Sequence, residues 1–169
     1  MKARSTLVAV DTNFLLDLAG DLASCHEAIA VMRARLPALA VLVPPTTLDE
    51  LGHAVTKPAP AGTLAQRAVR SILQPWKFQP VDLEPVQHGI AERIAENIRT
   101  RGYLPHDEVN DAFILAEAAL LGCALLVTSD RHLLEAPAGP LKLLFDSHDV
   151  AAPLIVSPRK IVRDFFPKR

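Results

Sequence analysis

Carboxylates follow two of the apolar runs in this sequence, at the point where each run ends. Asp11 comes directly after the first run, and Asp130 follows a later run after Thr128 and Ser129. Short apolar runs of this kind are typical of buried strands in a parallel sheet. If the strands are parallel, Asp11 and Asp130 lie at the same edge of the sheet, which is where such sheets bind ligands.

Two more acids lie near the start of a predicted helix. An apolar run is closed by two prolines, and Thr46 or Thr47 then fits the N-cap of the helix that follows. Asp49 and Glu50 would fall in its first turn, where the helix dipole favours acids. Successive helical residues point about 100° apart, so we expect Glu50 at the site and Asp49 in solvent.

A third group of polar residues opens the most apolar predicted helix, residues 107–121. Asp107 and Asp111 are four residues apart, so both can face one way, and Asn110 lies beside them. The next residues, 112–116, are all apolar. Asp111 therefore lies at the border of the core, where an unneutralised carboxylate is costly.

Four of these acids are the predicted catalytic and metal-binding set: Asp11, Glu50, Asp111 and Asp130. Gathered at one edge, they repel one another and require a cation. Oxygen ligands suit Mg²⁺, Mn²⁺ or Ca²⁺ rather than zinc, and Mg²⁺ usually completes its shell with substrate phosphates. The set therefore predicts phosphodiester or phosphate chemistry. Asp107 could be an outer metal ligand or only an acid that stabilises its helix.

Each of these residues also has a purely structural interpretation. Asp130 could cap a short helix, Asp111 could lie on a solvated helix face, and Glu50 could be a surface acid. Four neighbouring polar residues are expected to orient the carboxylates by hydrogen bonds. They are Thr12, Asn13, Thr128 and Ser129, although Asn13 could instead cap the helix after the first strand.

The net charge of −1 argues against a strongly basic surface for nucleic acid, but it leaves room for a local basic rim. Arg67, Arg70, Lys57, Lys77 and Arg131 could form such a rim, or they could lie on ordinary solvated helix faces. The six histidines lack metal-ligand spacing and are expected at the surface, with His132 nearest to the proposed site.

The elements that would position these residues alternate between strand and helix, which predicts an α/β fold with helices on both faces of the sheet. The predicted sheet strands are Leu7–Val10, Val41–Val43, Leu125–Val127 and Leu154–Val156, with Leu141–Phe145 as an extra candidate and 77–83 as a small strand or loop. The predicted helices are 25–36, one with Thr46 or Thr47 as its N-cap, 63–73, 85–101, 107–121, 131–135 and one opened by Pro158.

Length and composition bound the class of protein. A chain of 169 residues, half of them apolar, predicts one domain, residues 1–169, with a sizeable core. No apolar run reaches the ~20 residues that span a bilayer, and Asp11 breaks the first apolar stretch, so we expect no signal peptide, no membrane and a cytoplasmic location. Cys25 and Cys123 are expected to be buried, reduced thiols rather than a disulfide.

Five segments, in order along the chain, resemble the motifs of the PIN-domain family. They are residues 8–17 (VAVDTNFLLD), 45–51 (PTTLDEL), 110–116 (NDAFILA), 126–134 (LVTSDRHLL) and 155–160 (IVSPRK). The acids that match the family motifs are Asp11, Glu50, Asp111 and Asp130. An Asp after a buried strand is common, so each motif alone is weak, but four acids in family order are a strong signal.

The resemblance implies a PIN-like three-layer α/β/α fold with a central parallel sheet. It also implies a single-strand-selective ribonuclease that uses Mg²⁺ or Mn²⁺ and leaves 5′-phosphate and 3′-hydroxyl ends. Many small bacterial members are VapC-type toxins that an antitoxin neutralises, so an antitoxin partner and a homodimer are expected beside the RNA substrate. The chain is longer than the most compact toxins, chiefly between Lys57 and Pro85.

Two other functions fit part of the pattern. A phosphatase of the haloacid-dehalogenase type also begins with an Asp after a strand, but its chemistry needs a second acid two residues later, where this chain has Asn13. A catalytically silent RNA-binding or scaffold module on the same fold would show an eroded set of acids. The intact set favours metal-assisted hydrolysis, in which the ion lowers the pKa of the attacking water.

Overall fold

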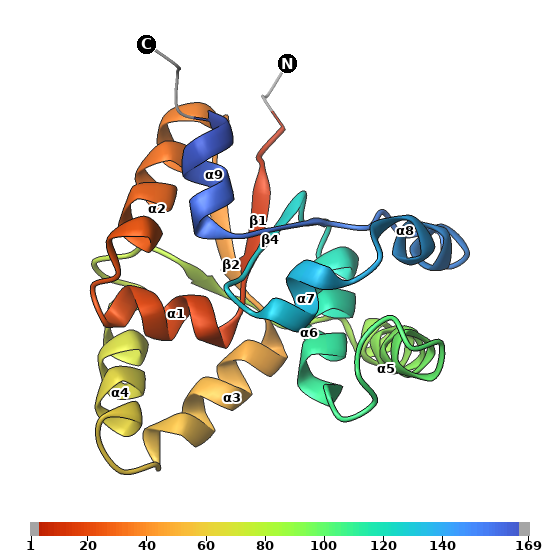
Figure 1. Ribbon diagram of the computed structural model, residues 1–169, viewed down its shortest axis with the longest axis horizontal. Coiled ribbons are helices and arrows are strands. Elements are labelled where there is room, and N and C mark those ends of the chain that lie inside the picture. Colours follow the sequence, from red (N-terminus) through yellow and green to blue (C-terminus); the bar gives the residue numbers. More distant parts are fainter. Residues whose placement is uncertain (1–3, 166–169) are drawn as a thin grey trace.

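The computed structural model describes residues 4–165 and has a five-stranded parallel sheet at its centre (Figure 1). Residues 1–3 and 166–169 lie outside the described part. The strands are β1 (Leu7–Val10), β2 (Ala40–Val43), β3 (Gln79–Pro80), β4 (Leu125–Val127) and β5 (Leu154–Val156), in the order β3-β2-β1-β4-β5. Every neighbouring pair is parallel, which confirms the predicted sheet.

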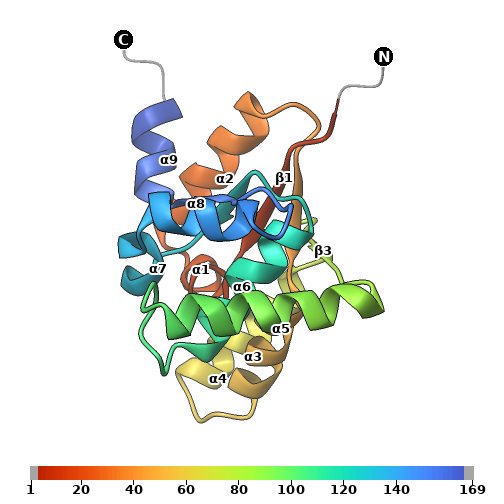
Figure 2. The ribbon, with the colours of Figure 1, turned by 90° about the vertical axis from the view of Figure 1, so that its right-hand side faces the viewer.

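Helices follow the strands along the chain and cover both faces of the sheet. They are α1 (Thr12–Ala19), α2 (Ala23–Arg35), α3 (Pro45–Val55), α4 (Ala61–Ser71), α5 (Pro85–Thr100), α6 (Val109–Leu120), α7 (Arg131–Glu135), α8 (Ala138–Asp146) and α9 (Pro158–Phe165). Figures 1 and 2 show α2 and α9 on one side of the sheet and α5 and α8 on the other. The fold is therefore the three-layer α/β/α arrangement that the sequence predicts.

The two cores reflect the alternation of side chains along the strands. On β1, Val8 and Val10 belong to a buried cluster with residues of α1, α2 and α9, whereas Ala9 belongs to a second cluster with residues of α5, α6 and α8. Side chains of a strand point alternately to opposite faces, so a strand buried on both sides must be apolar throughout. This is why β1 and β4 appear in the sequence as unbroken apolar runs.

The chain changes direction across the sheet between β3 and β4. The strands β1, β2 and β3 progress to one edge, and the chain then returns through α5 and α6 to place β4 on the other side of β1. Ligands of such sheets bind outside the carboxyl ends of the strands where the strand order reverses. Asp11, at the end of β1, lies next to that point.

The expected extra strand Leu141–Phe145 is wrong, because these residues form part of α8. Leu141, Leu144 and Phe145 are buried, whereas Leu143 is 72% exposed. Positions i, i+3 and i+4 share one face of a helix, and this face packs in the second core. Pro140 is tolerated because it lies in the first turn.

Two smaller expectations are also settled. Cys25 and Cys123 are free and buried, as predicted for reduced thiols. Among the described residues, none of the helices combines the length and the apolar character needed to cross a bilayer.

Candidate active site

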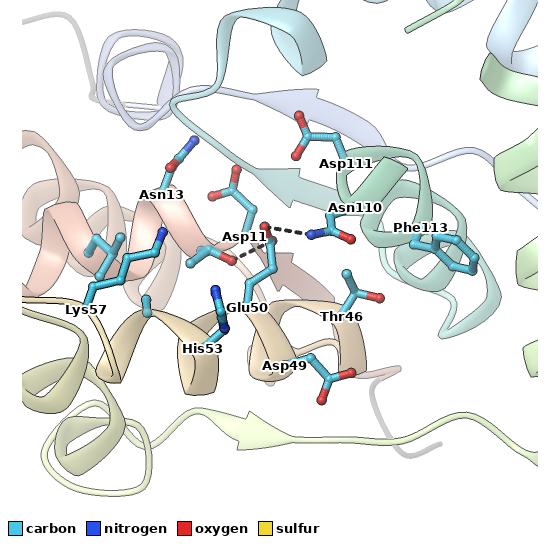
Figure 3. A pocket seen from close by; sticks show the side chains of 13 residues that line it. Asp11, Asn13, Thr46, Asp49, Glu50, His53, Lys57, Asn110, Asp111 and Phe113 are labelled. Carbon is cyan, nitrogen blue, oxygen red and sulfur yellow. Dashed lines mark hydrogen bonds between the residues drawn. The ribbon is translucent and has the colours of Figure 1, made fainter. Parts of the chain in front are cut away.

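A cleft of about 650 Å³ lies at the carboxyl ends of the central strands. Side chains from α1, α3 and α6 point into it (Figure 3). Its lining consists of Asp11, Thr12, Asn13, Leu16, Thr46, Asp49, Glu50, His53, Ala54, Lys57, Asn110, Asp111 and Phe113. Three of the four predicted catalytic acids are in this set.

Asp11 is the most deeply buried of these acids, with 2% of its surface exposed. One carboxylate oxygen accepts a hydrogen bond from the backbone N–H of Phe14 at 2.8 Å, and the other accepts one from the hydroxyl of Thr128. Burial raises the pKa of Asp11 to about 7, although these two hydrogen bonds lower it. Asp11, and not Asn13, thus caps α1, and its carboxylate is held at the end of β1.

Glu50 is held by neighbours from two other helices. Its Oε1 accepts a hydrogen bond from the Thr12 hydroxyl at 2.8 Å, and its Oε2 accepts one from the Asn110 side-chain amide at 3.2 Å. Thr12 lies at the start of α1 and Asn110 near the start of α6, so these bonds tie three helices together at the cleft. The dashed lines in Figure 3 mark these two bonds.

The predicted start of the helix that carries Glu50 is wrong. α3 begins at Pro45, with Pro44 rather than Thr46 or Thr47 as the N-cap residue. Proline is favoured at the first helical position, because its missing N–H would have no helical partner there. Glu50 therefore lies in the second turn, where the helix dipole has little effect.

Asp111 lies in the first turn of α6, and its side chain points toward the space above Asp11 (Figure 3). Burial is the main cause that raises its pKa to about 8, and the charges of Asp130, Asp11, Glu108 and Glu50 add to the effect. The solvated helix face that Asp111 could have occupied is therefore not its environment. Positive charge near this carboxylate would favour its ionised form.

Asp130 performs the capping role that was its structural interpretation. Its Oδ1 accepts hydrogen bonds from the backbone N–H groups of His132 at 2.8 Å and Leu133 at 3.2 Å. Its Oδ2 accepts a hydrogen bond from the Asn13 side chain at 3.4 Å. Asp130 is not in the cleft lining, but its charge raises the pKa of both Asp11 and Asp111. The two interpretations of this residue are thus compatible.

The sequence suggested that Asp107 and Asp111 share one face of a helix. In the structure they do not, because Asp107 precedes α6. α6 begins only at Val109, and Asp107 lies in the preceding turn, where its carbonyl accepts a hydrogen bond from the Val109 N–H at 2.9 Å. Asp107 is also absent from the cleft lining. The prediction that the helix begins at Asp107 is wrong, because the Asp107 carbonyl and the Val109 N–H pair with each other in a turn instead.

Three of the four residues expected to orient carboxylates donate hydrogen bonds to them. Thr12 donates to Glu50, Asn13 to Asp130 and Thr128 to Asp11. Ser129 is exposed, and its hydroxyl makes no hydrogen bond within residues 4–165.

Glu117 is a functional candidate that the sequence reasoning missed. Only 3% of its surface is exposed, and its carboxylate accepts hydrogen bonds from the Thr46 N–H at 3.1 Å and from the Thr46 hydroxyl at 2.6 Å. Burial raises its pKa, while these hydrogen bonds lower it. Glu117 thereby fixes the start of α3 against α6. An acid within the apolar stretch of a predicted core helix was the available signal.

The chemistry of the cleft fits a divalent cation. The groups in its lining that could bind a metal ion include carboxylate and amide oxygens. The raised pKa values of Asp11 and Asp111 show that their ionised forms are disfavoured without positive charge nearby. Oxygen donors of this kind suit Mg²⁺ or Mn²⁺. Within residues 4–165, no three His, Cys, Asp or Glu side chains are arranged to hold one ion. The chemical type of the donors fits the ion, whereas their positions in this structure do not enclose one.

The family model described as PIN domain matches residues 8–139. Among curated proteins, none matches the chain.

Several solved structures share the fold. VapBC2 from Rickettsia felis, bound to a DNA fragment from its promoter, gives a TM-score of 0.63 at 13% identity over 90% of this chain and 98% of that one. VapBC-1 from nontypeable Haemophilus influenzae gives 0.56 at 16% identity, over 90% and 98%. FitAcB from Neisseria gonorrhoeae gives 0.53 at 20% identity, over 89% and 97%. Likeness at such identities concerns the fold.

Proposed function

The chain belongs to the PIN-domain family, because the family model matches residues 8–139, and we propose that the chain is a metal-dependent endoribonuclease that hydrolyses single-stranded RNA. The observation that carries the proposal is one cleft at the edge of the sheet that Asp11, Glu50 and Asp111 all line. Their mutual repulsion is relieved by a cation, and a polyanionic substrate needs the same cation to approach.

Asp11, Glu50, Asp111 and Asp130 would hold Mg²⁺ or Mn²⁺, with Asp107 as a weaker outer candidate that the cleft lining does not support. When bound, the ion supplies Lewis acidity that makes water a better nucleophile and offsets charge at the scissile phosphate. No side chain need act as nucleophile, and the proposed products carry 5′-phosphate and 3′-hydroxyl ends.

The surrounding side chains keep the acids in place for this chemistry. Thr128 and the Phe14 N–H hold both oxygens of Asp11, while Thr12 and Asn110 hold those of Glu50. Such partners restrict the carboxylate rotamers and leave less reorganisation for the moment when ion and substrate bind.

The biological role is proposed from the solved relatives. Two of them are VapBC2 and VapBC-1, and the fold of this chain is similar over nearly their full length. We therefore propose an antitoxin as protein partner, a homodimer as the assembly, the cytoplasm as the location, and residues 1–169 as one domain.

The test is cleavage of an end-labelled single-stranded RNA of mixed sequence by the purified chain, with Mg²⁺, with Mn²⁺ and with chelator. We expect cleavage only with metal, and its loss in Glu50→Gln. The matched control is Glu92→Gln, because Glu92 is exposed on α5 and does not line the cleft. Cleavage that persists in chelator, or that Glu50→Gln retains in full, would overturn the proposal. Complete inactivity of the parent would favour a silent RNA-binding module.

A further inference from the structure

The cleft has a basic end as well as an acidic one. Lys57 is the only Lys or Arg among the described residues that line it, and His53 lies between Lys57 and Glu50 in the sequence. In Figure 3, both side chains rise from the side of α3 toward the space between Asn13 and Glu50. The carboxylates repel phosphate when no ion is bound. Among the described residues that line the cleft, Lys57 is therefore the one Lys or Arg side chain that can attract a phosphodiester strand.

The sequence spacing explains why these residues share one side of the cleft. His53 follows Glu50 by three residues within α3, which is the spacing of one helix face, and Lys57 follows in the turn after the helix. His53 lies about 5 Å along the helix axis from Glu50, at about 1.5 Å per residue. Lys57 lies two residues beyond the end of α3. Both side chains are therefore displaced along α3 from the acids, toward the neighbouring part of a bound strand.

The turn after α3 fixes the backbone of Lys57. The Lys57 N–H donates to the carbonyl of Ala54 at 3.1 Å, and the Thr56 hydroxyl donates to the carbonyl of His53 at 2.7 Å. Gly62, at the start of α4, packs so closely on Lys57 that any Cβ there would collide with the Lys57 carbonyl oxygen. The backbone position from which the Lys57 side chain extends is thus set by the α3–α4 connection.

The other basic residues considered from the sequence do not serve the cleft. Arg67 forms an ion pair with Asp21 at 2.8 Å, and Arg131 forms one with Glu135 at 2.7 Å. Arg70 and Lys77 do not line the cleft. By contrast, the side chains of Lys57 and His53 have neither an ion pair nor a hydrogen bond to any residue in 4–165.

We infer that His53 and Lys57 form a phosphate-binding subsite at the α3 end of the cleft, which holds a backbone phosphate of single-stranded RNA next to the phosphate that is cut. Lys57 supplies the charge, and the imidazole N–H of His53 donates a hydrogen bond to a phosphate oxygen. The inference rests on the proposed function in taking RNA as the ligand and the acidic end of the cleft as the place of cleavage. It assigns the subsite to residues outside the metal-binding set.

The first measurement is affinity for a labelled 12-nucleotide single-stranded RNA of mixed sequence, in chelator, at a series of salt concentrations. Lys57→Gln should weaken binding several-fold and reduce the slope of log K against log salt by about 0.7, the value for one lost phosphate contact on a single strand. His53→Gln should weaken binding with little change in slope. Lys57→Arg should retain both affinity and slope, because it keeps the charge.

The matched control is Lys77→Gln, which removes the same charge from an exposed site outside the cleft and should leave affinity and slope unchanged. The melting temperature of each variant verifies folding. The second measurement is RNA cleavage in Mg²⁺ or Mn²⁺, in which Lys57→Gln should raise KM more than it lowers kcat.

The outcomes separate this inference from the proposed function. RNA binding that depends on Lys57 in a chain that never cleaves would uphold the subsite and refute the nuclease. Metal-dependent cleavage with an unchanged KM and salt slope in Lys57→Gln would uphold the nuclease and overturn the subsite. Equal losses in Lys57→Gln and Lys77→Gln, or no RNA binding by the parent, would also overturn it.

Discussion

At the scale of single residues, burial and charge conflict most strongly at Asp111 and Asp11. Burial is the first cause of the raised pKa at each, to about 8 and about 7, and neighbouring carboxylates add to it. In the absence of a cation, the burial and crowding of these carboxyl groups lower the free energy of unfolding. Functional sites commonly carry such costs.

Asp111→Asn removes one charge and nearly preserves the shape of the side chain. We predict that the variant loses RNA cleavage, whereas its metal-free form is at least as heat-stable as the metal-free parent. Thermal unfolding in chelator and a cleavage assay with metal are the measurements. A metal-free variant that melts clearly below the parent would instead identify Asp111 as a structural residue.

The same shifts predict a pH dependence of the metal-free protein. The pKa values of Asp11 and Asp111 are higher in the folded state than the ordinary 3.8, so the folded state holds these protons more tightly than the unfolded state. The stability they contribute is complete below about pH 4 and is lost as pH rises through about 7 and 8. In urea unfolding with chelator, Asp111→Asn should therefore gain stability relative to the parent between pH 5 and 9. A constant difference over that range would show that Asp111 titrates normally.

At the scale of elements, α3 lines more of the cleft than α1 or α6 does, and it is held at both ends. At the start of α3, Thr46 donates two hydrogen bonds to Glu117 of α6. After the end of α3, Gly62 of α4 packs on the turn that contains Lys57. Glu50 and His53 lie between these two contacts, so a shift of α3 would displace side chains at both the acidic and the basic end of the cleft.

Glu117→Gln should place an amide against the two Thr46 donors. We expect a loss of about 1–3 kcal/mol in the free energy of unfolding, because a buried donor is left without an acceptor. Cleavage should fall further than that loss of stability alone requires, since Glu50 shifts with α3. Urea unfolding and kcat/KM are the measurements, with the exposed Glu92→Gln on α5 as control. Full cleavage activity in Glu117→Gln would contradict this positioning role.

Two glycines make a matched pair for the α3–α4 connection. Gly62→Ala should destabilise the protein by about 1–3 kcal/mol, because the new Cβ meets the Lys57 carbonyl and the turn must shift. Gly89→Ala on α5 should stabilise it by about 0.5–1 kcal/mol, because no atom lies within 4 Å of the new Cβ and alanine favours the helix. Denaturant midpoints of both variants give the comparison, and effects of the same sign would contradict the packing at Gly62.

At the scale of the whole molecule, the acids come from segments far apart in the sequence. Asp11 and Asp130 are linked through Thr128 and Asn13, although more than a hundred residues separate them. Unfolding disperses these acids, so an ion that binds the cleft has high affinity only for the folded chain. Binding and global stability are therefore coupled.

Mg²⁺ or Mn²⁺ should raise the melting temperature of the parent, by an amount that grows with ion concentration. The same addition should raise that of Asp111→Asn less, because the variant has lost one donor. Calorimetry in chelator and at several ion concentrations measures both shifts. Equal shifts in the two proteins would place the ion elsewhere.

The sequence alone determined most of the layout. Strands buried on both faces must be apolar, so β1, β2 and β4 are visible as runs, and the acids that follow β1 and β4 could be located from those runs. The long amphipathic helices were predicted for the same reason, since 3.6-residue periodicity reports a buried face. Leu141–Phe145 was misassigned because a short apolar run fits either period until its packing partners are known.

Only the tertiary structure decided which polar side chains serve the cleft. The sequence presented Lys57 and Arg67 as equivalent rim candidates, but Arg67 pairs with Asp21 whereas Lys57 lines the cleft. It likewise gave no partner for Glu117, whose acceptor role depends on Thr46, 71 residues away. Burial and periodicity are local properties that a sequence records, whereas the pairing of charges and hydrogen bonds between distant segments depends on how the helices pack on the sheet.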